Sequence, residues 1–162
     1  MTSPLEIVEA DLNRAADAQD VVALTAAYAR DPMGYGKPLP SEVLDRLIPG
    51  LRDHPTTLIF LAYLDRKAVG FATCFRGFST FQALPLVNIS DLAVLPEYRG
   101  QGVGRALLAA IEQKARDLGC CRLTLEVQEN NGRARHVYER AGYSQAVYGE
   151  TTGGSLYYWK HL

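Results

Sequence analysis

The chain has 162 residues, of which 48% are apolar and 22% charged, and its formal net charge is −1. These values are typical of one globular domain that buries a core without metals or disulfides. They favour neither a disordered chain nor a protein that presents a strongly basic surface to nucleic acid.

The three cysteines, Cys74, Cys120 and Cys121, form no CxxC pair, and the three histidines are far apart. This spacing predicts neither a zinc site nor a disulfide framework, so we expect reduced thiols. The first residues lack a basic segment followed by an apolar one, and no apolar run reaches about 18 residues. We expect a cytoplasmic chain with no metal, no nucleic-acid partner and no membrane partner.

The first third of the chain is expected to form a strand and two helices. Leu5 to Ala10 is a candidate strand. Asp17 is expected to cap a helix that fails near Asp31-Pro32, because the residue before proline avoids helical geometry. Ser41 is expected to cap a second helix that ends around Pro49-Gly50.

The remaining elements alternate between strands and helices. In chain order we expect strands at 57–64, 68–75 and 86–94, a looser segment at 77–85, a helix at 103–118, a strand at 122–127, a helix at 131–141 and strands at 144–149 and 156–160. A strand, a helix and a strand in succession imply a parallel pair. The predicted fold class is α/β (an α+β mixed sheet) with about seven strands and helices on both faces, in one domain over residues 1–162.

Asn88 to Leu108 contains the most informative motif. An apolar run is followed by Arg99-Gly100-Gln101-Gly102-Val103-Gly104 and then by an amphipathic segment. This order presents bare backbone N–H groups at a helix N-terminus, where phosphate oxygens bind, and glycine lets them approach. A loop that merely turns the chain is the plain alternative. A dinucleotide fingerprint is disfavoured because its third glycine would fall on Arg105 or Leu107. A P-loop lacks its Gly-Lys-Ser/Thr.

Four ordered patterns carry a resemblance to a known family. They are Leu92-Ala93-Val94-Leu95-Pro96, then Arg99-x-x-Gly102-x-Gly104, then Leu123-Thr124-Leu125-Glu126-Val127, then Asn131-x-x-Ala134-x-x-x-Tyr138-x-x-x-Gly142-Tyr143. Together they resemble the GNAT superfamily of N-acetyltransferases, and the central region is somewhat similar to diamine acetyltransferases. The resemblance is strong from about Leu58 to Leu162 and is limited to the layout before it.

The resemblance implies a GNAT-like acyl-CoA N-acyltransferase fold with acetyl-CoA as acetyl donor. Strands four and five would be parallel and splayed, so that the pantetheine arm pairs with strand four. A backbone N–H near Ala93 or Val94 would polarise the thioester carbonyl. The implied cofactor-binding residues are Leu92, Ala93, Val94, Arg99, Gly100, Gln101, Gly102, Val103, Gly104, Arg105, Ala106, Asn131, Ala134 and Tyr138.

Asn131 and Tyr138 share one helix face by their spacing. In the family the asparagine contacts the pantetheine and the tyrosine hydroxyl lies near the sulfur. We therefore expect Tyr138 to be the general acid that protonates the leaving thiolate. A tyrosine at this position can also serve only in core packing.

The general base is the open question. Many relatives place Glu or His at the position of Ser90, and a serine has no useful basicity. Asp91 is adjacent, but regular strand alternation would place it on the other face. Glu126 is the predicted catalytic carboxylate, and Glu150 and a water chain to solvent stay open as alternatives.

The acceptor is expected to meet the loops at 33–38, 77–84 and 151–155. The predicted substrate-binding residues are Tyr28, Tyr35, Phe78, Ser79 and Ser90. The predicted reaction is acetyl transfer to a primary amine of a small molecule, such as a polyamine or alkylamine, by direct attack in a ternary complex. Acetylation of a protein N-terminus or lysine, and a non-catalytic acyl-CoA sensor, are the alternatives. The expected assembly is a homodimer.

Overall fold

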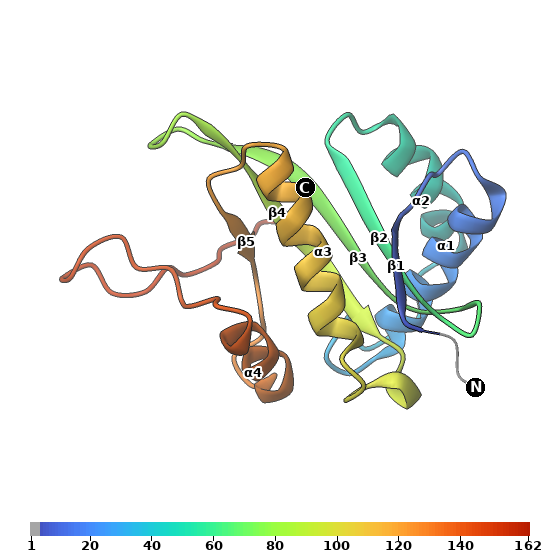
Figure 1. The fold of residues 1–162 in the computed structure, drawn as a ribbon. Helices are drawn as coiled ribbons and strands as arrows, with labels where there is room; N and C mark the ends of the chain where they lie inside the picture. Colours follow the sequence, from blue (N-terminus) through green and yellow to red (C-terminus); the bar gives the residue numbers. More distant parts are fainter. Residues whose placement is uncertain (1–3) are drawn as a thin grey trace. The chain divides into compact units, whose positions relative to one another are not determined.

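A five-stranded sheet forms the centre of the first part of the chain (Figure 1). The computed structural model describes residues 4–162, and the chain forms two compact units, Met1–Gln128 and Glu129–Leu162. The sheet lies in the first unit. Its strands are β1 (Glu6–Glu9), β2 (Thr57–Leu64), β3 (Lys67–Ser79), β4 (Leu84–Val94) and β5 (Leu123–Leu125).

The strands follow one another across the sheet in the order β1-β2-β3-β4-β5. Neighbours from β1 to β4 are antiparallel, whereas β4 and β5 are parallel. The parallel pair is confirmed, because α3 (Val103–Asp117) connects its two strands. The expected number of strands is wrong: within residues 4–162 the sheet has five strands rather than about seven.

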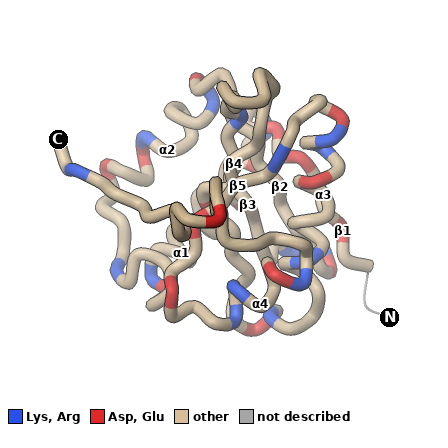
Figure 2. The backbone as a smooth tube through the Cα atoms, turned by 90° about the vertical axis from the view of Figure 1, so that its left-hand side faces the viewer, with Lys and Arg blue, Asp and Glu red and all other residues tan. Residues whose placement is uncertain are grey.

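Helices cover both faces of this sheet, as expected (Figure 1). On one face lie α1 (Ala15–Arg30) and α2 (Ser41–Asp53). On the other face lies α3, which begins so close to β3 that a Cβ on Gly70 would be 3.1 Å from Val103 Cγ1. Lys and Arg are interspersed with Asp and Glu along the helices of the first unit (Figure 2).

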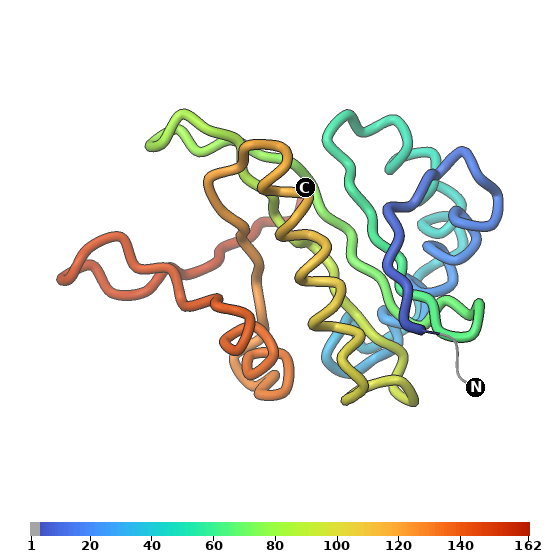
Figure 3. Tube along the Cα trace, viewed as in Figure 1, coloured from blue at the N-terminus to red at the C-terminus, as the bar shows by residue number. Residues whose placement is uncertain are grey.

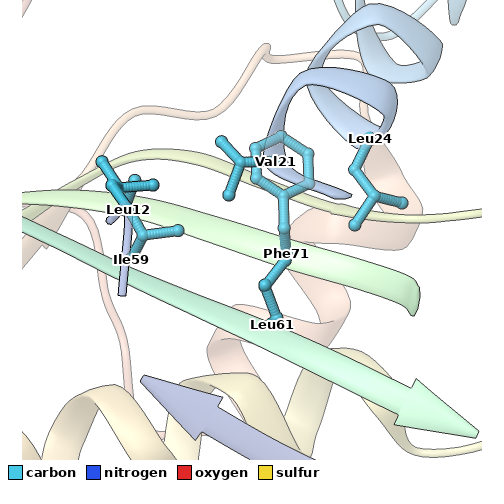
Figure 4. Close-up of a cluster of buried hydrophobic side chains, with 6 residues drawn as sticks. All are labelled: Leu12, Val21, Leu24, Ile59, Leu61 and Phe71. Carbon is cyan, nitrogen blue, oxygen red and sulfur yellow. The ribbon is translucent and has the colours of Figure 1, made fainter. Parts of the chain in front are cut away.

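A cluster of apolar side chains forms the core between α1 and the sheet (Figure 4). Val21 and Leu24 point from the helix toward Leu61 and Phe71 on the strands. Val21, Leu61 and Phe71 have no exposed surface. Burying such side chains contributes about 1.5–3 kcal/mol each to folding. This core fixes the position of the last turn of α1 against β3 and β4.

The predicted cap of α1 is wrong. The helix begins at Ala15, so Asp17 lies inside its first turn rather than before it. The Asp17 carboxylate accepts a hydrogen bond from the Asp11 N–H, at 2.9 Å, and fixes the chain that enters the helix. A short polar side chain near a helix start thus signals the region but not the residue at which the helix begins.

The predicted end of α2 is also wrong, because the helix continues through Pro49 to Asp53. Proline removes one helical hydrogen bond. Two contacts beyond it offset this loss. Leu51 packs against the core under α1, and Arg52 Nη2 donates to the Leu12 carbonyl at 2.8 Å. Tertiary packing therefore outweighs the local signal for termination.

The two final predicted strands, 144–149 and 156–160, do not form. After α4 (Gly132–Arg140) the second unit has one isolated bridge, between Val147 and Gly154. The side chains of Leu156, Tyr157, Tyr158 and Trp159 are between 70% and 83% exposed. Apolar and β-forming residues favour an extended chain, but a strand also needs a partner edge to pair with.

Residues 76–87 form an arm that continues the β3–β4 hairpin beyond β2 (Figure 3). The last pair between β2 and β3 is Thr57 with Phe75, whereas β3 and β4 stay paired to Ser79 and Leu84. The segment expected to be loose is therefore mostly regular hairpin. Phe78 and Phe81 are 62% and 89% exposed on this arm.

Candidate functional site

The glycine loop forms an open helix N-terminus, as the sequence predicts. A single 3₁₀ turn, Pro96–Tyr98, leads into the loop, and Gly102 is the residue before the first turn of α3. Gly100 and Gly102 have φ of 75° and 84°, which other residues adopt at a cost. A Cβ on Gly100 would meet no atom within 4 Å.

The backbone donors of this helix start face outward. Ala106 is the first residue whose N–H bonds back, to the Gly102 carbonyl at 3.0 Å. The N–H groups of Val103, Gly104 and Arg105 therefore have no carbonyl one turn earlier to bond with. The helix dipole adds a partial positive charge at the same point. An anion can approach these donors because Gly100 is open, and the side-chain atom nearest to a Cβ on Gly102 is the cationic Arg105 Nη2, at 3.9 Å.

Strand β4 ends next to this loop with one edge unpaired. Its pairs with β5 are Val87, Asn88 and Ile89 with Leu123, Thr124 and Leu125. Its pairs with β3 continue to Val94, opposite Gly70. Within residues 4–162 no strand pairs with the other edge of Asp91 to Val94. This edge can accept an extended ligand as a strand would be accepted.

One backbone donor on this edge can be identified from alternation along the strand. Leu95 donates its N–H to the Val69 carbonyl of β3, at 2.9 Å. Successive N–H groups of a strand point to opposite edges. The N–H of Val94 therefore points to the unpaired edge, whereas that of Ala93 points toward β3. Of the two donors proposed from sequence, Val94 fits the geometry.

A β-bulge at Ser90 changes which side chains face the α1 side of the sheet. Thr73 pairs with Asp91 and Cys74 with Ile89, so Ser90 is an extra residue in β4. The Ser90 hydroxyl donates to Asn88 Oδ1 at 3.3 Å, which places both side chains on one face.

Asp91 lies on that same face, so the expectation that alternation turns it away from Ser90 is wrong. Asp91 pairs with Thr73, and Asn88 pairs with Phe75. Thr73 and Phe75 are two residues apart on β3. Residues two apart on a strand share a face. The bulge thus brings two consecutive polar side chains to the side on which α1 ends. The sequence carries no signal for it, because a bulge depends on the residue count of the partner strand.

Asp91 lies in a poorly solvated environment. Burial raises the pKa of its carboxyl group. Burial also raises the pKa of the Tyr28 hydroxyl, with further contributions from the Asp91 and Asp31 carboxylates. The Tyr28 ring packs edge-on against Phe71, with centroids 6.3 Å apart. A carboxyl group with a raised pKa next to a half-buried tyrosine has the features of a functional group in many sites.

Cys74 lies across the sheet from this group. Burial and the Asp91 carboxylate raise the pKa of its thiol to about 12. It is therefore protonated at neutral pH, and a thiol without thiolate character is a poor nucleophile.

Arg99, expected to contact the cofactor, is held by two other groups. Its Nε donates to the Val94 carbonyl at 3.0 Å. Its Nη2 forms an ion pair with Asp31 Oδ2, at 2.5 Å. Asp31 directly follows α1. From the sequence, Asp31 is expected only to mark the end of a helix. Its ion-pair partner lies 68 positions away in the sequence, so no local pattern indicates the pair.

Glu126, the predicted catalytic carboxylate, is the first residue after β5. Asn88 Nδ2 donates to Thr124 Oγ1 at 2.9 Å, and Glu126 lies two residues beyond Thr124. The β4–β5 pairing ends at Leu125, one residue before Glu126, and the Glu126 side chain is exposed.

The predicted acceptor residues do not gather in one place. Phe78 and Ser79 lie on the arm, and five residues of extended strand from Thr73 to Phe78 span about 17 Å. Ser79 is buried and accepts a hydrogen bond from Arg122 Nη2 at 3.2 Å. Tyr35 is 60% exposed with Lys37 Nζ over its ring. Of the five, Tyr28 and Ser90 lie near the unpaired end of β4.

The second unit holds the other predicted site residues on one helix. Asn131 precedes α4, and its Oδ1 accepts the Ala134 N–H at 3.2 Å. Asn131 is thus a helix cap, which leaves its amide nitrogen as a donor. The ring of Tyr138 lies 6.0 Å from that of Tyr143.

No group of three or more His, Cys, Asp or Glu side chains that could hold a metal ion occurs in the described part of the chain. Within residues 4–162, none of the helices has the length and apolar content that a membrane crossing requires.

The sequence matches one family and several relatives. A sequence model of the Acetyltransferase (GNAT) family matches residues 21–143. The chain is 25% identical over 132 residues to the uncharacterized N-acetyltransferase YhfO of Bacillus subtilis (strain 168), which covers 82% of this chain and 89% of that protein. It is 35% identical over 74 residues to the thialysine N-epsilon-acetyltransferase of Bos taurus, which covers 46% of this chain and 43% of that protein.

The fold also matches a solved structure. The crystal structure of a probable acetyltransferase superposes with a TM-score of 0.79 at 23% sequence identity, and the match covers 96% of this chain and 99% of that chain. At this identity the likeness concerns the fold alone.

Proposed function

The chain belongs to the Acetyltransferase (GNAT) family, and we propose that it transfers the acetyl group of acetyl-CoA to a primary amine of a small molecule. One observation carries the proposal. The unpaired edge of β4, from Asp91 to Val94, leads directly into the open N-terminus of α3. An extended arm that ends in a pyrophosphate needs these two features in this order.

The donor substrate fits the residues that are present. The pyrophosphate of CoA would accept hydrogen bonds from the N–H groups of Val103, Gly104 and Arg105, with help from the helix dipole. The pantetheine arm would lie along the unpaired edge of β4. The N–H of Val94 would then donate to the thioester carbonyl oxygen and stabilise the negative charge that forms there during attack.

The acceptor amine would approach from the face that carries Asp91. Its nitrogen lone pair attacks the thioester carbon, the new C–N bond forms and the C–S bond breaks. Asp91, directly or through one water, takes the proton that the amine loses. A raised pKa brings this carboxylate closer to the basicity that a general base needs near neutral pH. Glu126 is the second candidate, because it directly follows β5, the parallel neighbour of β4.

The departing CoA thiolate takes a proton from the Tyr138 hydroxyl, and Asn131 holds the pantetheine through its side-chain amide. Both roles rest on the resemblance of α4 to the family pattern. The spacing of the two residues on one helix supports them. Because the acyl group passes straight to the amine, no acyl-enzyme forms, in keeping with the protonated state of the buried Cys74 thiol.

A small-molecule acceptor is favoured by two observations. The thialysine N-epsilon-acetyltransferase of Bos taurus, 35% identical over 74 residues, is named for acetylation of the ε-amine of thialysine, an amino acid. The Asp91 carboxylate contributes to the raised pKa of Tyr28, so it places negative charge on the acceptor face, whereas the charge of Asp31 is compensated by Arg99. Such a face attracts a protonated amine.

A thiol-release assay across an amine panel tests the proposal. The purified chain is incubated with acetyl-CoA and with polyamines, alkylamines, amino acids and peptides that carry a free N-terminus or lysine. We expect CoA release with at least one small amine. Release with peptides alone would assign the enzyme to protein acetylation. CoA binding without release for any acceptor would indicate a sensor.

A further inference from the structure

The guanidinium of Arg99 joins two segments that lie far apart in the sequence. It bonds to the Val94 carbonyl through Nε and to Asp31 through Nη2. The side chains of Arg99 and Asp31 are only 25% and 13% exposed. An ion pair that is largely out of water keeps its geometry better than one on the surface. Arg99 is therefore committed to these two partners rather than open to an incoming phosphate.

Asp31 organises the segment that we call the acceptor loop, residues 31–37. Its Oδ1 accepts the N–H of Met33 at 2.8 Å, and its carbonyl accepts the N–H groups of Gly34 and Gly36 at 2.9 and 3.1 Å. A negative side chain at the C-terminus of a helix is unfavourable for the helix dipole. The ion pair with Arg99 offsets this cost, so the loop conformation depends on Arg99.

A second side chain ties the same loop to the other strand of the parallel pair. Gln128, three residues beyond the end of β5, donates from Nε2 to the Met33 carbonyl at 3.2 Å. Arg99 follows β4 in the same way. The acceptor loop is thus held by one side chain from the chain beyond each strand, on both sides of the edge that would receive the donor.

We propose that Arg99 is a positioning residue that couples the acceptor loop to the peptide group of Val94, whose N–H would polarise the thioester. The inference rests on the proposed function. The residue whose N–H would bind the thioester oxygen is Val94, and its carbonyl is held by the guanidinium that also holds Asp31. A donor that occupies the β4 edge fixes Val94 and the glycine loop, and through Arg99 it orders the acceptor loop. By linkage, an ordered acceptor loop favours the donor by the same factor.

Hydrogen exchange tests this coupling without any need for turnover. Amide exchange in residues 31–37 is measured with and without CoA in the wild-type chain, in Asp31→Asn and in Glu9→Gln. The asparagine oxygen can still accept from Met33, so Asp31→Asn removes the ion pair and keeps the turn. Glu9→Gln is the matched control, because it removes one partner of the ion pair with Lys114, on β1.

We expect CoA to slow exchange of the acceptor loop by about fivefold or more in the wild-type chain and in the control. In Asp31→Asn the slowing should be lost although calorimetry still shows CoA binding. Arg99→Gln should lose it as well. Unchanged slowing in Asp31→Asn, or none in the wild-type chain with CoA bound, overturns the coupling alone. No CoA binding to the wild-type chain overturns the proposed function and the coupling with it.

Steady-state kinetics add a readout that a merely structural ion pair would not give. In Asp31→Asn the KM for the amine at saturating acetyl-CoA and the KM for acetyl-CoA at saturating amine should rise by about the same factor, about fivefold, because the coupling is reciprocal. Arg99→Gln should also lower kcat, because Val94 loses its contact. Adding Asp31→Asn to Arg99→Gln should change the KM for the amine little, because the two substitutions remove the same ion pair. A rise in the KM for the amine alone, or additive effects on that KM, would contradict the coupling.

Discussion

The two halves of β4 differ in how their edges are used. From Val87 to Ile89 the strand is bonded on both edges, to β3 and to β5, and two of these three side chains, Val87 and Ile89, are buried. From Asp91 to Val94 it is bonded to β3 only, and each of these side chains is half-buried. One strand therefore serves as frame at its start and, in the proposed function, as binding surface at its end.

The change occurs within two residues. The bulge at Ser90 follows directly on the last pair with β5. A bulge bends its strand and increases the local twist. Such a bend provides a physical reason for the parallel strands to part at this point. Variants of the unpaired end should therefore affect binding and chemistry, whereas variants of the paired end and of the arm should affect at most stability.

The largest effect is expected at the glycine loop. Gly102→Trp places a bulky side chain over the N–H groups that open α3. Losing several hydrogen bonds to a charged group should weaken CoA binding by about 100-fold or more in calorimetry. Gly119→Trp is the matched control, since Gly119 also has a positive φ, 71°, at the other end of α3 with open space around it. Equal affinity of Gly102→Trp and wild type for CoA would overturn the assignment of this loop.

Asp91→Asn should have the next largest effect. Without a base, kcat should fall by about 100-fold or more, with CoA affinity nearly unchanged. The wild-type rate should decline as pH falls through the raised pKa of Asp91, and the variant should lack this step. Asp45→Asn, an exposed acid of α2, is the control. A retained pH step in Asp91→Asn would transfer the role to another group, with Glu126 first in line.

Tyr138→Phe tests whether the second unit supplies an acid. Turnover should fall by about tenfold, less than for the base, because a thiolate leaves readily near neutral pH. The affinity for acetyl-CoA should change little. Pre-steady-state rates across pH measure the effect, with Tyr148→Phe as control on an exposed tyrosine of the same unit. An identical rate in wild type and Tyr138→Phe at every pH would remove the acid role.

The ionised Asp91 carboxylate should also lower the free energy of unfolding at neutral pH. Burial raises its pKa in the folded chain above the unfolded value, so the folded state holds this proton to higher pH. The stabilisation is complete below the unfolded pKa and is lost as pH rises through the folded pKa. Asp91→Asn should therefore raise the melting temperature at pH 7 and leave it unchanged at about pH 3. A lower melting temperature at pH 7 would show that the ionised carboxylate is stabilised by its surroundings.

The smallest effect is expected on the arm. Phe78→Ala should leave kcat and both KM values within about twofold of wild type, the range of ordinary surface substitutions. Tyr28→Ala, at the unpaired end, is the contrasting variant and should raise the KM for the amine. If the two variants behaved alike, the division of β4 into frame and site would fail.

The parts of this site that depend on local chemistry could be predicted from the sequence. Two glycines at positive φ before an amphipathic helix leave a signal within a few residues, and so does a strand on either side of that helix. The resemblance to the GNAT family then gives acetyl-CoA as the expected donor. The parts that depend on pairing could not be predicted, because neither the bulge at Ser90 nor the ion pair of Asp31 with Arg99 has a local pattern.

The errors in the fold have the same origin. Pro49 predicts the end of a helix, but the packing of Leu51 on the core continues α2 beyond it. Residues 144–149 and 156–160 read as strands, yet strand formation needs a partner edge that the pattern does not supply. The homodimer, the cytoplasmic location and the single domain over residues 1–162 stay predictions.

The bulge at Ser90 also bears on how the enzyme could change its acceptor. A regular strand offers one side chain in two to a given face, but here positions 90 and 91 both face the acceptor side. Because Asp91 is the proposed base, position 90 is the one of the two that can vary the charge and size of the acceptor surface while β3 keeps its pairing with both flanks. For a library that seeks new amine specificity, position 90 therefore offers variation at little risk to the sheet or to the proposed base.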